Sequence, residues 1–150
     1  MSPAQRGRDD GERDLARLLS GLRPERQAGV YRFASAARID DIDFERVLCF
    51  MHEPEGISIV AQESAVPPTA CLSELRCCWI TLKVYSSLAA VGLTAAVADV
   101  LAEADIACNV VAGTRHDHLF VPLDQADQAM ALLEALQRRS AAGLNDGARS

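Results

Sequence analysis

Hydrophobic residues alternate with polar ones in several short stretches of the chain, which is typical of strands with one buried face. The clearest stretch is 79–85, where Ile80, Leu82 and Val84 share one face and Thr81 lies on the other. Further short apolar runs predict strands at 29–34, 47–51, 57–61, 106–110 and 119–121.

Three other stretches repeat apolar residues every three or four positions and predict amphipathic helices. They cover 12–21, 93–104 and 124–139, and Asp124 is a plausible cap for the last one. The second half of the chain therefore has the order β-α-β-β-α, which opens a ferredoxin-like β-α-β-β-α-β unit. No closing strand follows Arg139, and a strand exchanged between the halves could supply it.

The first half, with one helix and three strands, predicts a divergent second unit. Together the halves predict an α+β fold of two ferredoxin-like units of the β-α-β-β-α-β type, with antiparallel sheets and helices on one face. Residues 1–11 and 140–150 are small and polar, and we predict that both are disordered tails.

Charge and composition exclude several classes of function. The formal net charge is −6 and aromatic residues make up only 5% of the chain, which disfavours binding to nucleic acid or anionic lipid. No stretch approaches the roughly 18 apolar residues of a membrane helix, and the first dozen residues lack the apolar core of a signal peptide. We therefore expect a cytoplasmic protein with no membrane or nucleic-acid partner.

Candidate catalytic residues lack the neighbours that catalysis needs. The five cysteines form no C-x-x-C pair and are interpreted as small buried hydrophobic residues. His116 and His118 could offer two metal ligands, although a solvated turn explains the H-D-H pattern better. We expect no metal, no cofactor and no catalytic residue, and keep an enzyme built on Cys, His and Asp groups as a third alternative.

The stretch SSLAAVGL at 86–93 carries the most informative local pattern. A strand ends, a loop containing Gly92 follows, and a helix begins. The first N–H groups of a helix and the positive end of its dipole favour a carboxylate. Gly92 could allow a ligand to approach closely, or could simply serve a tight turn.

Longer strings in this region resemble the ACT domain, and in particular a group of small bacterial ACT-domain proteins. The matching strings are WITL, SSL-x-AVGLTAAV, CNVVAG and HDHLFVP, and the likeness is strong over 77–137. GVYRFA and EGISIVAQ resemble the N-terminal ACT-like half of the same group. The resemblance implies subdomains at 12–76 and 77–139, arranged as in aspartate kinase regulatory modules and cytosolic arginine sensors.

The resemblance further implies a small-molecule-binding regulatory protein without catalytic activity, because ACT domains typically bind amino acids between two such units. Carried over by position, the pocket residues would be Ser86, Ser87, Val91, Gly92 and Leu93 from the loop and Asn109, Val110 and Val111 from a strand. Asp117 could meet a basic ligand side chain. Asn109 has a second explanation as an outward polar residue of an amphipathic strand.

The expected partners are an amino acid, a second copy of the chain and an unidentified protein target. We expect a homodimer because ACT sheets commonly extend side by side and a unit without a closing strand has an open edge. The alternative is an ACT-fold interaction module that has lost ligand binding.

Overall fold

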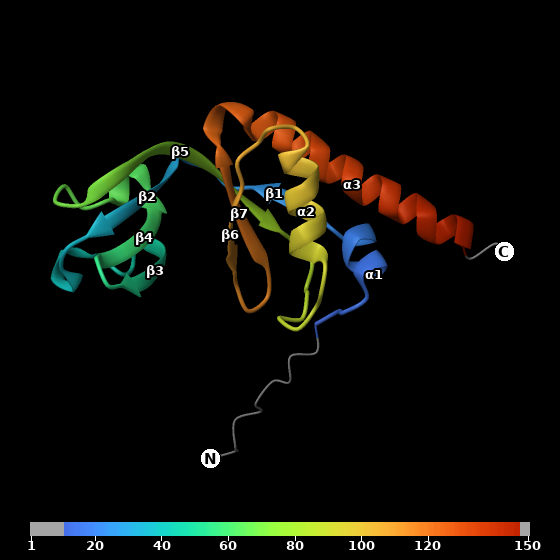
Figure 1. The fold of residues 1–150 in the computed structure, drawn as a ribbon, viewed down its shortest axis with the longest axis horizontal. Helices are drawn as coiled ribbons and strands as arrows, with labels where there is room; N and C mark the ends of the chain where they lie inside the picture. Colours follow the sequence, from blue (N-terminus) through green and yellow to red (C-terminus); the bar gives the residue numbers. More distant parts are fainter. Residues whose placement is uncertain (1–10, 148–150) are drawn as a thin grey trace, which may run out of the picture.

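The computed structural model describes residues 11–147, which form one antiparallel sheet with α-helices packed against one of its faces (Figure 1). The α+β class is confirmed. The strands are β1 (Pro24–Arg26), β2 (Tyr31–Ala36), β3 (Val47–Glu53), β4 (Gly56–Gln62), β5 (Cys71–Leu82), β6 (Asn109–Ala112) and β7 (Asp117–Pro122). The α-helices are α1 (Leu15–Ser20), α2 (Leu93–Ala102) and α3 (Ala126–Gly147), and the short 3-10 turns are η1 (Ile39–Asp41), η2 (Glu63–Ala65) and η3 (Leu123–Gln125).

Strand β5 belongs to both units of the fold. Its first part pairs with β2 and its second part pairs with β7, giving the strand order β3-β4-β2-β5-β7-β6. The two partners meet at Cys77, which is opposite Tyr31 on one side and opposite Pro122 on the other. The sequence pattern predicted only the later part of this strand and extended it to Tyr85, whereas β5 ends at Leu82.

The first unit consists of β2, β3, β4 and the start of β5, in the strand order of a ferredoxin-like unit. Within the described residues its two crossovers hold only the 3-10 turns η1 and η2, so the predicted β-α-β-β-α-β pattern lacks its α-helices here. The connecting stretches explain this. One is the acidic segment 38–45, which has no apolar stripe of helical period, and the other contains Pro67-Pro68, which breaks a helix.

The second unit receives its closing strand from the N-terminal part of the chain. Strand β1 pairs with β5 from Pro24 opposite Leu82 to Arg26 opposite Ile80, so the suggested strand exchange is present. Helix α1 accompanies it, and Leu18 and Leu22 are buried in the same core as Ile80. Residues 15–26 therefore pack in space with the second unit, although they precede the first unit in the sequence.

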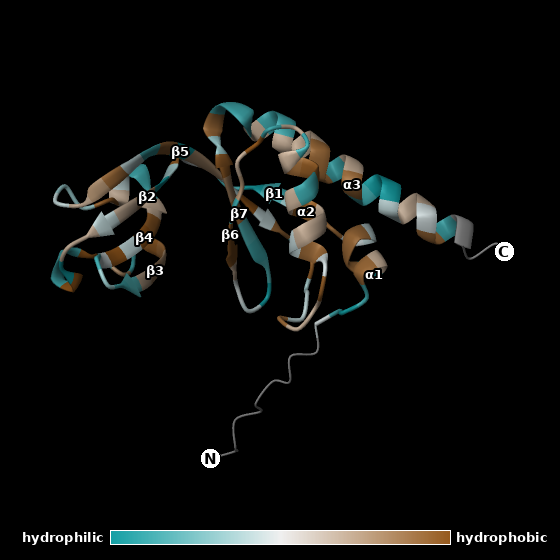
Figure 2. Cartoon of the chain, in the orientation of Figure 1, coloured by the Kyte–Doolittle hydropathy of each residue, from teal (hydrophilic) through white to brown (hydrophobic). Residues whose placement is uncertain are grey.

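Helix α3 is longer than the amphipathic pattern predicted. The predicted tail at 140–150 is wrong for 140–147, which continue the helix, while 148–150 lie outside the described residues. Alanines favour helix here, and the Ser140 hydroxyl donates to the Leu136 carbonyl. The ribbon of α3 alternates between hydrophobic and hydrophilic residues (Figure 2). Of the predicted tail at 1–11, residues 1–10 lie outside the described part of the chain.

The sheet has a different core on each face. Alternate residues of β5, namely Cys78, Ile80 and Leu82, pack under the three α-helices. Cys77 and Trp79 lie on the opposite, helix-free face with aromatic residues of β2 and β7. Among residues 11–147, no helix is both long and apolar enough to cross a membrane.

The cysteines only partly follow the prediction that all five are buried. Cys77 and Cys78 are buried, Cys49 and Cys108 are half-buried, and Cys71 is exposed at the start of β5. Burial raises the pKa of the Cys77 thiol to about 11, so it stays protonated near neutral pH. Burial also raises the pKa of Cys49.

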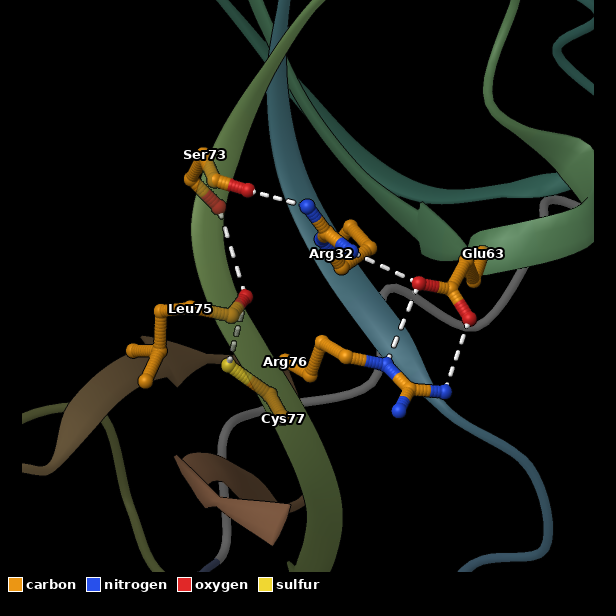
Figure 3. Close-up of polar contacts among 6 residues, drawn as sticks. All are labelled: Arg32, Glu63, Ser73, Leu75, Arg76 and Cys77. Carbon is orange, nitrogen blue, oxygen red and sulfur yellow. Dashed lines mark hydrogen bonds and ion pairs between the residues drawn. The ribbon is translucent and has the colours of Figure 1, made fainter.

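A cluster of charged residues joins β2, β5 and η2 where the register between β2 and β5 shifts (Figure 3). The guanidinium of Arg32 donates to Glu63 over 2.7 Å and also to the Ser73 carbonyl. Arg76 donates to both oxygens of the same carboxylate, over 3.2 and 3.1 Å. Glu63 therefore holds two cations that face one another across the strand pair.

We predict that Leu18→Ala lowers the free energy of unfolding by about 2–5 kcal/mol, because Leu18 is 0% exposed in the core of the second unit. Leu144→Ala on α3 is the matched control, since Leu144 is 40% exposed, and should change it by about 0.5 kcal/mol or less. Urea denaturation measures both. Equal effects would show that α1 is not part of this core.

We predict that the Glu63 cluster makes stability depend on pH. Hydrogen bonds from Arg76 and then Arg32 lower the pKa of Glu63, so the stabilisation is present above the usual glutamate pKa and is lost as the pH falls through the lowered value. Urea midpoints between about pH 7 and pH 3 should drop less in Glu63→Gln than in the wild type. Glu74→Gln, at an exposed position of β5, is the control and should keep the full drop.

Candidate functional site

A small cavity of about 100 Å³ lies where β5 is followed by the loop that leads into α2. Four residues predicted from the sequence line it together: Ser86, Ser87, Leu93 and Asp117. The remaining walls come from Leu88, Ala90, Thr94 and Ala112. Loop, helix start and the β6–β7 hairpin thus meet in one place.

The start of α2 supplies hydrogen-bond donors to this region. Gly92 is the N-cap residue and has no side chain, so the N-cap position itself offers no side-chain cap to the first N–H groups of the helix. Helix α2 is ten residues long, and its dipole adds positive potential at Leu93 and Thr94. An anion such as a carboxylate is the ligand that this arrangement favours.

Asp117 supplies the opposite charge in the same cavity. It is half-buried at the start of β7, and the structure gives its carboxylate no hydrogen bond within the part of the chain it describes. Burial raises the pKa of Asp117, while His118 and His116 act in the opposite direction. A carboxylate without a hydrogen-bonded partner is a ready acceptor for an ammonium group.

Gly92 itself has a packing role. Its φ is +101°, in the left-handed region that favours glycine. A Cβ there would come within 2.9 Å of Leu15 of helix α1, so the open side of Gly92 is filled by protein. The structure thus favours the tight-turn explanation over close approach of a ligand at Gly92. The neighbouring Val91 is 83% exposed and lies outside the cavity.

The three residues predicted on the strand side lie elsewhere. Asn109 is exposed on β6, in keeping with its alternative explanation as an outward polar residue. Val110 and Val111 line a different cleft, which opens on the helix-free face toward β3 and β4. The predicted site is therefore divided, with its loop residues and Asp117 at one cavity and its valines at another.

An aromatic cluster on the helix-free face was missed from the sequence. Trp79 and Tyr31 pack edge to face with ring centroids 5.3 Å apart, and Phe120 stacks beside Trp79. The indole N–H of Trp79 donates to Nδ1 of His118 over 3.0 Å. Burial lowers the pKa of His118, which keeps the ring neutral near neutral pH. Aromatic residues two positions apart, at Tyr31 and Phe33, were the available signal.

Comparison with known proteins agrees with this architecture. Models of the ACT domain match residues 74–135 and 10–67. A Vibrio cholerae protein of unknown function, described as a possible transport protein, is 38% identical, with a TM-score of 0.72, covering 82% of this chain and 95% of that one. No curated protein matches the chain.

Regulatory parts of aspartate kinases share the fold at lower identity. The regulatory subunit from Thermus flavus is 8% identical with a TM-score of 0.54, covering 75% of this chain and 95% of that one. Aspartokinase III of E. coli, in complex with aspartate and ADP, is 11% identical with the same TM-score, covering 77% of this chain and 32% of that one. These two show a common fold. The two matching family models show that the chain belongs to the ACT-domain family and carries two ACT domains in tandem.

Proposed function

We propose that this protein is a cytoplasmic regulatory module that binds a free amino acid and has no catalytic activity of its own. The observation that carries the proposal is the cavity at the start of α2, where a helix N-terminus and the carboxylate of Asp117 face the same space. A free amino acid has one carboxylate and one ammonium group close together. It therefore matches both charges of the cavity at once.

In this proposal the ligand carboxylate accepts hydrogen bonds from the first N–H groups of α2, and its ammonium group donates to Asp117. Asp117 thereby meets the ammonium group, instead of the basic side chain considered from the sequence. The volume of about 100 Å³ lies well below the roughly 300 Å³ of the smallest usual ligand pockets. The cavity therefore favours an amino acid with a small side chain, such as glycine, alanine or serine.

We predict that such an amino acid raises the melting temperature of the protein. At about a hundred times its dissociation constant a ligand stabilises by about 2.7 kcal/mol, which corresponds to about 5–11 °C for a domain of this size. Asp117→Asn should abolish most of the shift, and Asp99→Asn, at an exposed position on α2, should retain it. Differential scanning fluorimetry with each of the twenty amino acids makes the comparison. If no amino acid moves the midpoint by a degree at millimolar concentration, the proposal fails.

The unliganded Asp117→Asn protein provides an internal check on folding. Burial raises the pKa of Asp117 in the folded protein, so the protonated carboxyl favours folding and the ionised carboxylate opposes it. The stability that the protonated form contributes is therefore lost as the pH rises through the raised pKa. Asparagine removes this cost. We therefore expect the melting temperature of unliganded Asp117→Asn at neutral pH to equal or exceed that of the wild type. A lost ligand response in that variant then reports on binding.

Apolar residues on β3 favour the alternative function, an interaction module. This edge strand exposes 47% of Phe50 and 65% of Met51, and Leu48 is also exposed. Edge strands with exposed apolar side chains pair readily with other chains. The closing strand of the second unit is filled by β1, and of the two end strands, β3 and β6, it is β3 that exposes large apolar side chains, so we place the expected homodimer at β3.

We predict a mass of about 32 kDa in solution, twice the 16.1 kDa of the chain, by light scattering at micromolar concentration. Met51→Lys on β3 should shift the protein toward the monomer, because a charge on an edge strand disfavours pairing. Leu88→Lys, which also replaces an exposed apolar residue but lies away from β3, should leave the mass unchanged. A wild-type mass of about 16 kDa would contradict the dimer.

A further inference from the structure

The helix-free face holds a larger cleft than the one at α2. It consists of two adjoining cavities of about 280 and 470 Å³, both of which are lined by Cys49 of β3 and Val111 of β6. It lies between β3 and β4 of the first unit and the β6–β7 hairpin of the second. Together the two cavities reach the size of a usual small-molecule pocket, which is roughly 300–1,000 Å³.

The walls of this cleft are mostly aromatic and aliphatic. Trp79 and Phe120 line the inner cavity, and Phe33 and Phe50 line the outer one. Glu53 is the charged residue at the outer cavity, where its carboxylate accepts from the Ser58 hydroxyl. Such walls suit a flat apolar molecule, and none of the described residues that line them is a cation that could hold a phosphate or a carboxylate.

His118 gives the inner cavity one directed hydrogen bond. Since Nδ1 accepts the indole N–H of Trp79, the neutral ring carries its proton on Nε2. His118 lines the inner cavity, and its Nε2 lies beside the backbone of Gly113, 3.2 Å from where a Cβ of that residue would be. A ligand at this end therefore meets a neutral N–H donor and profits from a hydrogen-bond acceptor.

We propose that this cleft is a second binding site, separate from the cavity at α2, for a neutral aromatic small molecule with one hydrogen-bond acceptor. The ring system lies among Trp79, Phe120 and the side chains of β3, and a carbonyl oxygen accepts from Nε2 of His118. Occupying the cleft buries apolar surface that the two units otherwise leave open to water. The site does not depend on the amino-acid cavity being functional.

Trp79 is the chain's single tryptophan, so its fluorescence reports directly on the cleft. The probes are 2-acetylnaphthalene and 2-ethylnaphthalene, which have nearly the same shape but differ in the carbonyl acceptor. We expect both to quench Trp79 saturably and the acetyl compound to bind about two- to tenfold more tightly. Quenching that does not saturate would overturn the site, and equal affinities would overturn the role of His118.

A pair of substitutions locates the binding. Val111→Phe fills the junction of the two cavities and should weaken binding of 2-acetylnaphthalene at least tenfold. Val91→Phe adds the same ring at a position that is 83% exposed and should leave binding unchanged. Melting curves confirm that both variants fold. Equal binding by the two folded variants would place the ligand elsewhere and overturn the proposal.

The wild-type protein supplies a test that needs no variant. Cys49 lines both cavities, whereas Cys71 is exposed outside them. Saturating 2-acetylnaphthalene should slow alkylation of Cys49 by N-ethylmaleimide at least fivefold and leave Cys71 unchanged, as measured by mass spectrometry. Unchanged alkylation of Cys49 would overturn the proposal. Protection of Cys49 to the same extent without the naphthalene would also overturn it, because a second copy of the chain would then be the occupant.

Discussion

Strand β5 forms hydrogen bonds with both units of the fold, and the arrangement of every other element follows from this sharing. Cys77 marks the transition, with Tyr31 opposite it on one edge and Pro122 on the other. A strand has two edges for hydrogen bonding. In the first part of β5 one edge pairs with β2 of the first unit, and in the later part the opposite edge pairs with β7 of the second unit. The remaining edge of the later part is closed by β1. The two units therefore form one sheet and share backbone hydrogen bonds.

The charged cluster at Glu63 joins β2 and β5 next to the point where β5 changes partners. The register between β2 and β5 shifts next to Arg32, and the Arg32 side chain reaches the Ser73 carbonyl on the neighbouring strand. Arg76 lies opposite Arg32, and two neighbouring guanidinium groups would repel one another without a carboxylate between them. Glu63 provides that carboxylate from the 3-10 turn after β4.

The β6–β7 hairpin separates the two candidate binding sites. Ala112 lines the cavity at α2 and also the cleft on the helix-free face. Asp117 and His118 are consecutive on β7, so their side chains leave the strand on opposite sides. One lines the small charged cavity and the other lines the aromatic cleft. A short hairpin thus presents an acid to one ligand environment and a neutral imidazole to the other.

The sequence by itself determined the type and approximate place of most elements, because the apolar residues that an element buries recur along the chain at the period of a helix or a strand. Alternation from Ile80 to Leu82 and the apolar stripe from Leu93 to Leu101 each predict a face that the structure buries. The loop residues Ser86, Ser87 and Leu93 were named through the resemblance to the ACT domain, and they lie within one continuous segment that ends a strand and starts a helix. The matching strings of the ACT domain cover this region as well.

Only the tertiary structure decided which distant segments meet. Strand β1 is three residues long and has no alternation to reveal it, so its place beside β5 depends on the open edge left by the second unit. Gly92 illustrates the same limit, because the residue that fills its open side is Leu15, far away in the sequence. Val111 and Cys49 line one cleft only because β5 brings their units together. The local pattern predicts which side of an element is buried. Which other element packs against that side depends on the sheet edges and apolar faces that remain open in the folded chain as a whole.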